Sequence, residues 1–274
     1  MNIEMFAEEG EKTALQAGAY LLEKFHTDFN VRHKGVINLV TEVDIAAEEM
    51  ITTRLRKSFP GHSILAEEKN SKTDRGHYTW IIDPLDGTTN YAHGFPFFSV
   101  SIGLEIAGQI EFGVVFDPVR NEVFTARRGY GAFCNGEPLH VSGTAPLGSA
   151  LLATGFPYDV WTSRQNNLAN FCAFALKALG IRRTGSAALD LCFVASGRLD
   201  GFWEAKLNPW DCAAGFLIVE ESGGRITDYS GHATSIYDAE VVASNGCIHD
   251  EMVEVLVNTS KGAVTPGSRD SLRM

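Results

Sequence analysis

One short region of the sequence constrains both the fold and the chemistry. Residues 78–82 form an apolar run, YTWII, and residues 83–90, DPLDGTTN, follow it directly. The run is typical of a buried β-strand. Pro84 fixes its own φ and pushes Asp83 into an extended conformation. Two carboxylates, Asp83 and Asp86, are therefore expected at the end of a rigid element.

The second half of this octet has the features of a helix start. Gly87 can turn the chain without steric cost, and Thr88, Thr89 and Asn90 carry hydroxyl and amide groups suited to a helix N-terminus. Hard oxygen ligands on a rigid element suit Mg²⁺, and a helix start with free N–H groups suits a phosphate. The alternative is a strand that ends in an acidic turn and continues as a loop.

Size and composition indicate a globular protein. A chain of 274 residues can hold one large domain or two modest ones. With 45% hydrophobic and 21% charged residues, it can bury a sizeable core. A formal charge of −11 argues against a nucleic-acid-binding surface. An anionic phosphate ester would need bound divalent cations to reverse the sign of the local field.

Cysteine usage and the absence of apolar leaders predict a cytoplasmic protein without membrane contact. The five cysteines are scattered and form no Cys-x-x-Cys pair, so a disulfide framework or a structural zinc site is not expected. No apolar segment approaches the length that spans a membrane, and no signal peptide is recognisable. The cysteines are Cys134, Cys172, Cys192, Cys212 and Cys247.

Two amphipathic helices are expected in roughly the first 60 residues. In the second, Ala47, Ile51 and Leu55 share a stripe with Asp44, one turn earlier. A carboxylate on a buried stripe must be paired, cap the helix or bind a ligand. A loop around Lys34 is expected between the helices. The stripe of the first helix comprises Ala14, Gly18, Leu21, Leu22 and Phe25.

The rest of the chain is strand-rich and then alternates strands with helices. Phe95, Phe97 and Phe98 are expected in the core. Helices are predicted near residues 165–179, 187–196 and 211–222, the last closed by two glycines. We expect one folded unit over residues 1–260, with an N-terminal half of about 1–145 and a C-terminal half of about 146–260. A flexible tail is expected at residues 261–274.

Several carboxylates stand at the ends of predicted elements. Glu67 follows a short apolar strand, and Asp211 follows Pro209 at a predicted helix start. Taken alone, Glu67 is typical of a solvated loop and Asp211 of an N-cap. Gathered with Asp83 and Asp86, they would repel one another unless cations intervened. Two or more Mg²⁺ ions, with the Leu85 main-chain carbonyl as a further ligand, would relieve that repulsion.

The combined motifs resemble those of the inositol monophosphatase family. The octet at residues 83–90, the segment WDCAAG at 210–215 and EESGG at 220–224 look like both signatures of that family. Residues 66–68, AEE, match its glutamate pair, and residues 185–191, GSAALDL, are similar to the bacterial branch. The match spans about residues 5–258. It implies a layered αβαβα sandwich of the α+β class, the inositol monophosphatase/fructose-1,6-bisphosphatase type.

The same resemblance implies an activity, a cofactor and a set of site residues. The activity is Mg²⁺-dependent hydrolysis of phosphomonoesters, with two or three ions, lithium sensitivity and a homodimer. Asp44, Thr88 and Glu67 would orient the attacking water. The implied metal ligands are Glu67, Asp83, the Leu85 carbonyl, Asp86 and Asp211. The implied substrate contacts are Asp86, Gly87, Thr88, Gly185, Ser186, Ala187, Glu204 and Asp211.

The substrate is left open between related phosphate esters. Inositol monophosphates are the first expectation, since the Glu204 carboxylate can accept hydrogen bonds from adjacent hydroxyls. Fructose 1,6-bisphosphate is the nearest alternative, with Arg182 or Arg183 to compensate a second phosphate. Histidinol phosphate and 3′-phosphoadenosine nucleotides are further alternatives. A different class of function is a regulatory binding protein that retains the fold without turnover.

Overall fold

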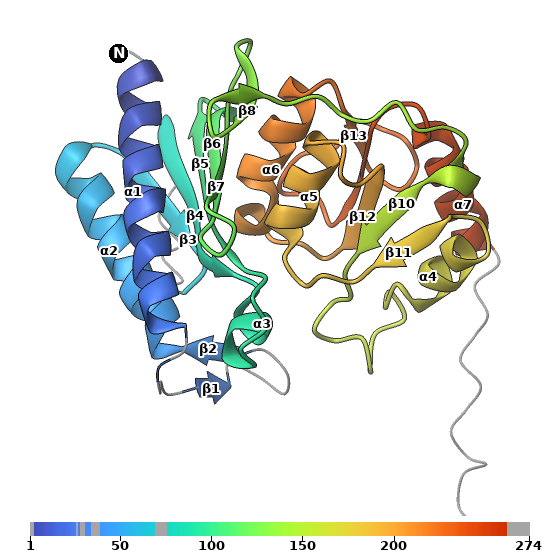
Figure 1. Ribbon diagram of the computed structural model, residues 1–274, viewed down its shortest axis with the longest axis horizontal. Helices are drawn as coiled ribbons and strands as arrows, with labels where there is room; N and C mark the ends of the chain where they lie inside the picture. The colour runs from blue at the N-terminus through green and yellow to red at the C-terminus, as the bar shows by residue number, and fades with distance from the viewer. Residues whose placement is uncertain (1–2, 26, 28–30, 34–38, 69–75, 262–274) are drawn as a thin grey trace, which may run out of the picture.

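The chain folds into five stacked layers in the computed structural model, in the order α, β, α, β, α (Figure 1). The structure describes residues 3–25, 27, 31–33, 39–68 and 76–261. The expected loop around Lys34 and the expected tail beyond residue 261 lie outside this part of the chain. The prediction of a layered αβαβα sandwich is confirmed.

The first sheet has seven strands in the order β3-β4-β5-β6-β7-β8-β9. β3 and β4 are parallel, and each later neighbour is antiparallel. The outer helices α1 (Ile3–Lys24) and α2 (Glu42–Ser58) cover one face (Figure 1). The strands are β3 (Ser63–Ala66), β4 (Tyr78–Asp86), β5 (Ser99–Ile106), β6 (Gln109–Asp117), β7 (Glu122–Arg127), β8 (Gly131–Cys134) and β9 (Glu137–Pro138), with a separate pair β1 (Val31–His33) and β2 (Leu39–Thr41).

The second sheet has five strands in the order β11-β10-β12-β14-β13. Its central strand, β12 (Gly201–Ala205), runs parallel to β10 and antiparallel to β14. The helices α4 (Leu168–Ala175) and α7 (His249–Lys261) cover its outer face (Figure 1). The other strands are β10 (Leu151–Thr154), β11 (Gly180–Arg182), β13 (Arg225–Thr227) and β14 (Glu240–Ser244), and a 3₁₀ turn, η1 (Leu147–Ser149), precedes β10.

Two helices, α5 (Ala187–Ala195) and α6 (Pro209–Glu221), form the central layer between the sheets (Figure 1). α6 approaches the first sheet closely, because small residues meet on both sides. A Cβ placed on Gly113 would lie 2.8 Å from Ala214 Cα. The small residues that follow Asp211 therefore serve close backbone packing. The central core between the sheets has α5 and α6 in its middle.

The boundaries of two helices differ from the sequence prediction, and one of these helices, α4, ends at Ala175 instead of near residue 179. α4 begins only at Leu168, because Asn167 has a positive φ of 64° and interrupts the helix. α6 begins at Pro209, with Asn208 as N-cap, so that Asp211 is the third helical residue and not the first. Within the described residues, no helix combines the length and apolar character that crossing a membrane requires.

Two apolar side chains expected in the interior are exposed instead. Leu22 keeps 45% of its surface, since the buried stripe of α1 runs through Leu21. Phe95 keeps 54%, because it lies in the turn after α3 (Thr88–Ala92). Phe97 and Phe98 are buried as predicted.

Candidate active site

Asp83 and Asp86 lie on the same face of β4 because the strand contains a bulge. Asp83 pairs with Ser101 and Asp86 with Ser99, so that three steps along β4 match two along β5. Side chains alternate between the faces of a regular strand, and residues three apart would point to opposite sides. The extra residue of a bulge restores the alignment. The strand β4 thus includes both aspartates, whereas the apolar run in the sequence ends before them.

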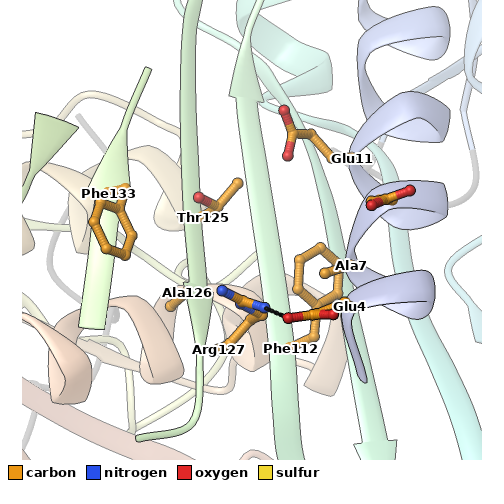
Figure 2. Close-up of a pocket in the computed structure, with 9 residues that line it drawn as sticks. Glu4, Ala7, Glu11, Phe112, Thr125, Ala126, Arg127 and Phe133 are labelled. Carbon is orange, nitrogen blue, oxygen red and sulfur yellow. Dashed lines mark ion pairs between the residues drawn. The ribbon is translucent and has the colours of Figure 1, made fainter. Parts of the chain in front are cut away.

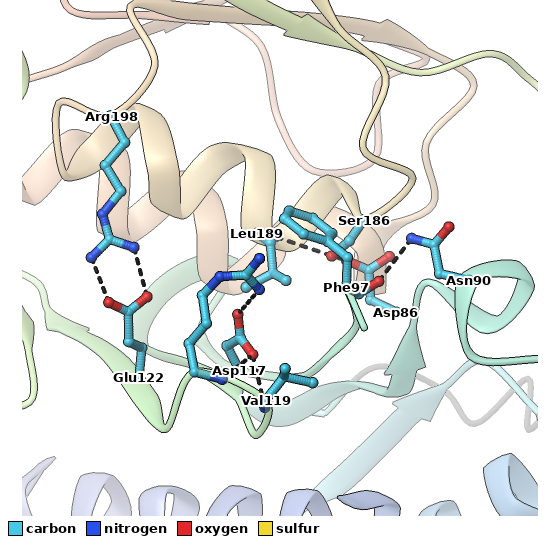
Figure 3. Close-up of polar contacts among 10 residues, drawn as sticks. Asp86, Asn90, Phe97, Asp117, Val119, Glu122, Ser186, Leu189 and Arg198 are labelled. Atoms are coloured by element: carbon cyan, nitrogen blue, oxygen red, sulfur yellow. Dashed lines mark hydrogen bonds and ion pairs between the residues drawn. The ribbon is translucent and has the colours of Figure 1, made fainter. Parts of the chain in front are cut away.

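Asp86 is bound by the start of α5, one hundred residues further along the chain. Ser186 Oγ donates to Asp86 Oδ2 at 2.5 Å, and the Ala188 main-chain N–H donates to the same oxygen at 2.9 Å. Figure 3 shows Asp86 next to Ser186 at this junction. Burial raises the pKa of Asp86 to about 6, and these hydrogen bonds oppose the rise. The sequence assigned Ser186 only to a substrate pocket and gave no sign of this contact.

Asp83 and Asp211 are carboxylates whose neighbours are also acidic. Burial raises the pKa of Asp83 well above its usual range, and the charges of Glu67, Asp86 and Asp211 raise it further. Burial also raises the pKa of Asp211, as do the charges of Asp86 and Glu67. The Leu85 N–H donates to Asp83 Oδ1 at 3.0 Å, and the Asn208 N–H donates to Asp211 Oδ2 at 2.6 Å. This mutual repulsion is the condition that a bound cation relieves.

The four carboxylates come from three different elements. Glu67 directly follows β3, Asp83 and Asp86 belong to β4, and Asp211 lies in the first turn of α6. In the part of the chain that the structure describes, no three Asp, Glu, His or Cys side chains are already grouped closely enough to bind one ion. The donor set nevertheless fits a hard cation, because it consists of oxygen ligands that share an electrostatic environment.

Asp44 and Thr88 are brought into contact from distant parts of the sequence. Thr88 Oγ1 lies 2.9 Å from Asp44 Oδ1 and 3.0 Å from the Leu85 carbonyl oxygen, and its single hydrogen can be donated to either acceptor. The other Asp44 oxygen accepts from the N–H of Thr41 at 2.8 Å and from its hydroxyl, which completes a capping box for α2. Burial raises the pKa of Asp44. The buried carboxylate therefore caps its helix and also holds the threonine.

The loop before α5 meets the octet through close backbone contacts. Gly87, with φ +93°, is the N-cap of the short helix α3, and a Cβ there would lie 3.4 Å from the Gly185 carbonyl oxygen. Asn90 Nδ2 donates to the Thr184 carbonyl at 2.8 Å and to the Phe97 carbonyl at 2.7 Å. Gly185 and Ser186 are thus adjacent to the octet.

Glu204 is half-buried on β12, and it lies beside the backbone that follows the end of β10. A Cβ on Gly155 would be 2.1 Å from Glu204 Oε1, so the carboxylate fills the space above that glycine. Burial raises the pKa of Glu204 to about 8, the charge of Asp190 adds to this, and the Arg183 guanidinium opposes it. Asp190 is itself buried and accepts from Thr184 Oγ1 at 2.6 Å. Of the two arginines singled out, Arg183 is the one that acts on Glu204.

One residue near the carboxylates had no signal in the sequence. Tyr158 belongs to the loop between β10 and α4, and the charges of Glu67, Asp211, Asp83 and Asp86 contribute, after burial, to raising its pKa. An isolated tyrosine in a loop gives no indication of an electrostatic interaction with distant carboxylates.

A groove elsewhere on the molecule does not coincide with this site. It has a volume of about 360 Å³ and lies between α1 and the strands β6 to β8 (Figure 2). Glu4 pairs with Arg127 across it at 3.9 Å, and Phe112 lies at its base. None of the predicted site residues lines it.

Known proteins share both the sequence and the fold. The inositol monophosphatase family matches residues 2–261. An inositol-1-monophosphatase of Synechocystis is 42% identical over 260 residues, which cover 94% of this chain and 91% of the relative. The Nus factor SuhB of Pseudomonas aeruginosa is 48% identical over 221 residues, covering 79% and 82% respectively.

Solved structures agree with these sequence matches. An inositol monophosphatase from Anabaena superimposes with a TM-score of 0.86 at 42% identity, covering 94% of this chain and 97% of that one. An IMPase/NADP phosphatase solved with Mg²⁺ and phosphate has a TM-score of 0.78 at 25% identity, covering 88% and 90%. The protein is thus a phosphoric monoester hydrolase. Within that class, it belongs to the inositol monophosphatase family, as its motifs predicted.

Proposed function

We propose that this protein hydrolyses inositol monophosphates to inositol and phosphate, with water activated by two or three Mg²⁺ ions. The observation that carries the proposal is the acidic site itself. Burial and the charges of three other carboxylates raise the pKa of Asp83, and the neighbouring charges that act on it are all acidic. Such a site favours a divalent cation, and a cation in turn favours an anionic phosphate.

The residues that would hold the ions are those at the edge of the first sheet and the start of α6. They are Glu67, Asp83, the Leu85 carbonyl, Asp86 and Asp211. When bound, Mg²⁺ supplies Lewis acidity, which lowers the pKa of water and neutralises charge on the ester. The bulge in β4 lets Asp83 and Asp86 serve neighbouring positions, and Ser186 fixes the orientation of Asp86.

Thr88 and Asp44 act together on the attacking water. Because Thr88 Oγ1 donates its hydrogen to Asp44 Oδ1, the lone pairs of that hydroxyl remain able to accept a hydrogen bond from water. The pair therefore orients the water and gives its proton a path towards a buried carboxylate. The main-chain N–H groups at Gly87 and Thr88 would bind the phosphate. Since α3 has only five residues, these groups matter more than any helix dipole.

Glu204 supports a polyol as the leaving group. Its carboxylate projects beside Gly155. A carboxylate can accept two hydrogen bonds from adjacent hydroxyls. Fructose 1,6-bisphosphate is the alternative for the same site, with Arg183 as the cation that would compensate its second phosphate.

The test is a phosphate-release panel with matched variants. The substrates are inositol 1-phosphate, fructose 1,6-bisphosphate, histidinol phosphate and 3′-phosphoadenosine 5′-phosphate, each with Mg²⁺ and with added Li⁺. Asp83→Asn should lower kcat on inositol 1-phosphate by about 10³-fold. Asp117→Asn is the control, because Asp117 is also buried but binds only Arg120 and its own turn. Activity that survives Asp83→Asn would contradict the metal-site proposal.

A regulatory binding role is the second candidate. It is favoured by the 48% identity to a protein named Nus factor SuhB. Isothermal titration with MgCl₂, combined with the substrate panel, separates the two proposals. Mg²⁺ binding without phosphate release from any of the four esters would support the regulatory role, whereas turnover supports the enzyme.

A homodimer in the cytoplasm completes the proposal. Leu168, Leu176 and Leu179 expose 48%, 88% and 73% of their surfaces beside β11, the edge strand of the second sheet. A second copy that covered this apolar patch would remove it from water. Light scattering should then find a dimer, and Leu176→Asp should convert it to a monomer. The five cysteines are free thiols, which supports a reducing compartment.

A further inference from the structure

The loop between β10 and α4, residues 155–167, is fastened firmly at its base. Asn167 Nδ2 donates to the Gly155 carbonyl at 2.6 Å and to Thr154 Oγ1 at 2.8 Å. Asn167 Oδ1 accepts from Trp203 Nε1 at 2.8 Å. These contacts join the two ends of the loop to each other and to β12. They do not reach its tip, where Tyr158 and Trp161 keep 55% and 69% of their surfaces exposed.

A single ammonium group holds the tip. Lys206 Nζ lies 2.9 and 2.7 Å from the two carboxylate oxygens of Asp159, and 2.7 Å from Ser163 Oγ. Ser163 thus accepts a hydrogen bond from Lys206. The neighbours of the ammonium lie more than 40 positions away in the sequence, so the contact exists only in the folded chain.

Lys206 occupies a backbone position that a lysine rarely adopts. Its φ is +65°, in the left-handed region, and its N–H donates to the Ala239 carbonyl at 2.5 Å. A residue other than glycine in this region is strained by about 1 kcal/mol or more, and such strain persists where other contacts determine the conformation. In the sequence, Lys206 directly follows β12 and lies between Glu204 and Asp211. From this position its side chain reaches Asp159 and Ser163 of the loop.

Tyr158 directly precedes Asp159, the residue that Lys206 binds. Burial raises the pKa of its hydroxyl, and the charges of Glu67, Asp83, Asp86 and Asp211 add to this. A phenol that stays protonated is a hydrogen-bond donor. In a site rich in acceptors, a donor of this kind suits an oxygen of an incoming phosphate ester.

We propose that Lys206 is a positioning residue for substrate binding: by binding Asp159 and Ser163, it holds the loop of residues 155–167 so that Tyr158 is in place when the phosphate ester arrives. The inference rests on the phosphatase function proposed above. It predicts that breaking the clamp reduces the fraction of molecules with a competent loop and raises KM, while the metal-bound chemistry and kcat stay nearly unchanged.

The first variant is Lys206→Asn. Asparagine is among the residues that best tolerate positive φ, so the substitution removes the ammonium without adding backbone strain. The KM for inositol 1-phosphate should rise about fivefold to tenfold, with kcat within about twofold and the unfolding temperature nearly unchanged. A purely structural role predicts the opposite: a lower unfolding temperature and a lower active fraction, with KM constant.

The partner variant and a control define the contact. Asp159→Asn should raise KM by a similar factor, and the double variant should be no worse than either single one, because all three lose the same clamp. Arg225→Gln breaks an ion pair of the same length, 2.7 Å to Asp250, on another surface and should leave KM unchanged. Additive effects in the double variant would overturn the clamp.

A readout independent of activity is limited trypsin digestion. Arg164 is exposed within the loop. Cleavage after Arg164 should be several times faster in Lys206→Asn and in Asp159→Asn than in the parent protein or in Arg225→Gln. Equal cleavage rates and an equal KM would refute the inference. If the parent protein releases phosphate from none of the four esters, the proposed function fails, and the digestion still decides whether Lys206 holds the loop.

Discussion

Ser186→Ala tests whether Asp86 depends on the start of α5 for its position. The Ser186 hydroxyl makes two contacts: it donates to Asp86 Oδ2 at 2.5 Å and caps α5 by accepting from the Leu189 N–H at 3.3 Å. Loss of an N-cap costs about 1 kcal/mol. A hydrogen bond to a charged group contributes about 1.5–3 kcal/mol. The free energy of unfolding should therefore fall by about 2.5–4 kcal/mol.

The effect on Mg²⁺ should be larger than this loss of stability suggests. A residue that orients a metal ligand typically changes metal affinity by about 10–100-fold when it is removed. The Mg²⁺ concentration that gives half-maximal phosphate release from inositol 1-phosphate should rise by that factor. Thermal unfolding with and without Mg²⁺ gives a second measure, because a weaker site yields a smaller stabilisation by the ion.

Ser142→Ala is the matched control for this experiment. Ser142 Oγ donates to Asp200 Oδ1 at 2.6 Å, and Asp200 is buried outside the predicted site. The control should lose a similar amount of stability and keep the Mg²⁺ dependence of the parent. The reasoning is refuted if Ser186→Ala leaves the Mg²⁺ requirement unchanged. A higher KM for the ester alone would instead favour the substrate-pocket role that the family resemblance gave to Ser186.

Three further predictions follow from individual features of the fold. His249 is fully buried, and burial lowers its pKa from 6.5 to about 4. The free energy of unfolding should be highest above pH 6.5 and should fall by up to about 3 kcal/mol as the pH drops towards 4. The reason is that only the unfolded chain gains the proton in this range. Urea unfolding at several pH values measures this, and a His249→Gln variant with the same pH dependence would contradict it. Gly155→Ala places a Cβ 2.1 Å from Glu204 Oε1 and should raise the KM for inositol 1-phosphate several-fold. Gly143→Ala should not, because a Cβ on Gly143 would point into open space. Equal KM values for the two variants would show that Glu204 does not belong to the substrate pocket. Because α5 and α6 lie between both sheets, residues 1–260 should unfold in one transition, and circular dichroism and tryptophan fluorescence should coincide; separate midpoints would indicate two independent halves.

The sequence was sufficient to predict the layers and to single out most acidic residues of the candidate site, because those signals are local. The apolar run before Asp83 predicted β4, and the stripe through Ile51 and Leu55 predicted the buried face of α2. Chain order and element type together then restrict the possible architectures. Helix boundaries were less well predicted. The start of α4 is set by the backbone of Asn167, and residue propensities do not indicate its positive φ.

The octet at residues 83–90 identified the two aspartates of β4, but not how they are arranged. Their common face depends on a bulge against β5, which is a property of strand pairing and not of either strand alone. The partners of Asp86 are likewise decided by a contact across 100 residues.

The amino-acid sequence by itself determined the family and the type of chemistry, through the carboxylates that it places on particular elements. Only the tertiary structure decided how those side chains are held. Ser186 meets Asp86, Thr88 meets Asp44, and Lys206 meets Asp159 because helices and loops from distant parts of the chain pack together. Hydrogen bonds act over about 3 Å, so the partners of a buried group depend on its neighbours in space, which sequence patterns specify only within one element.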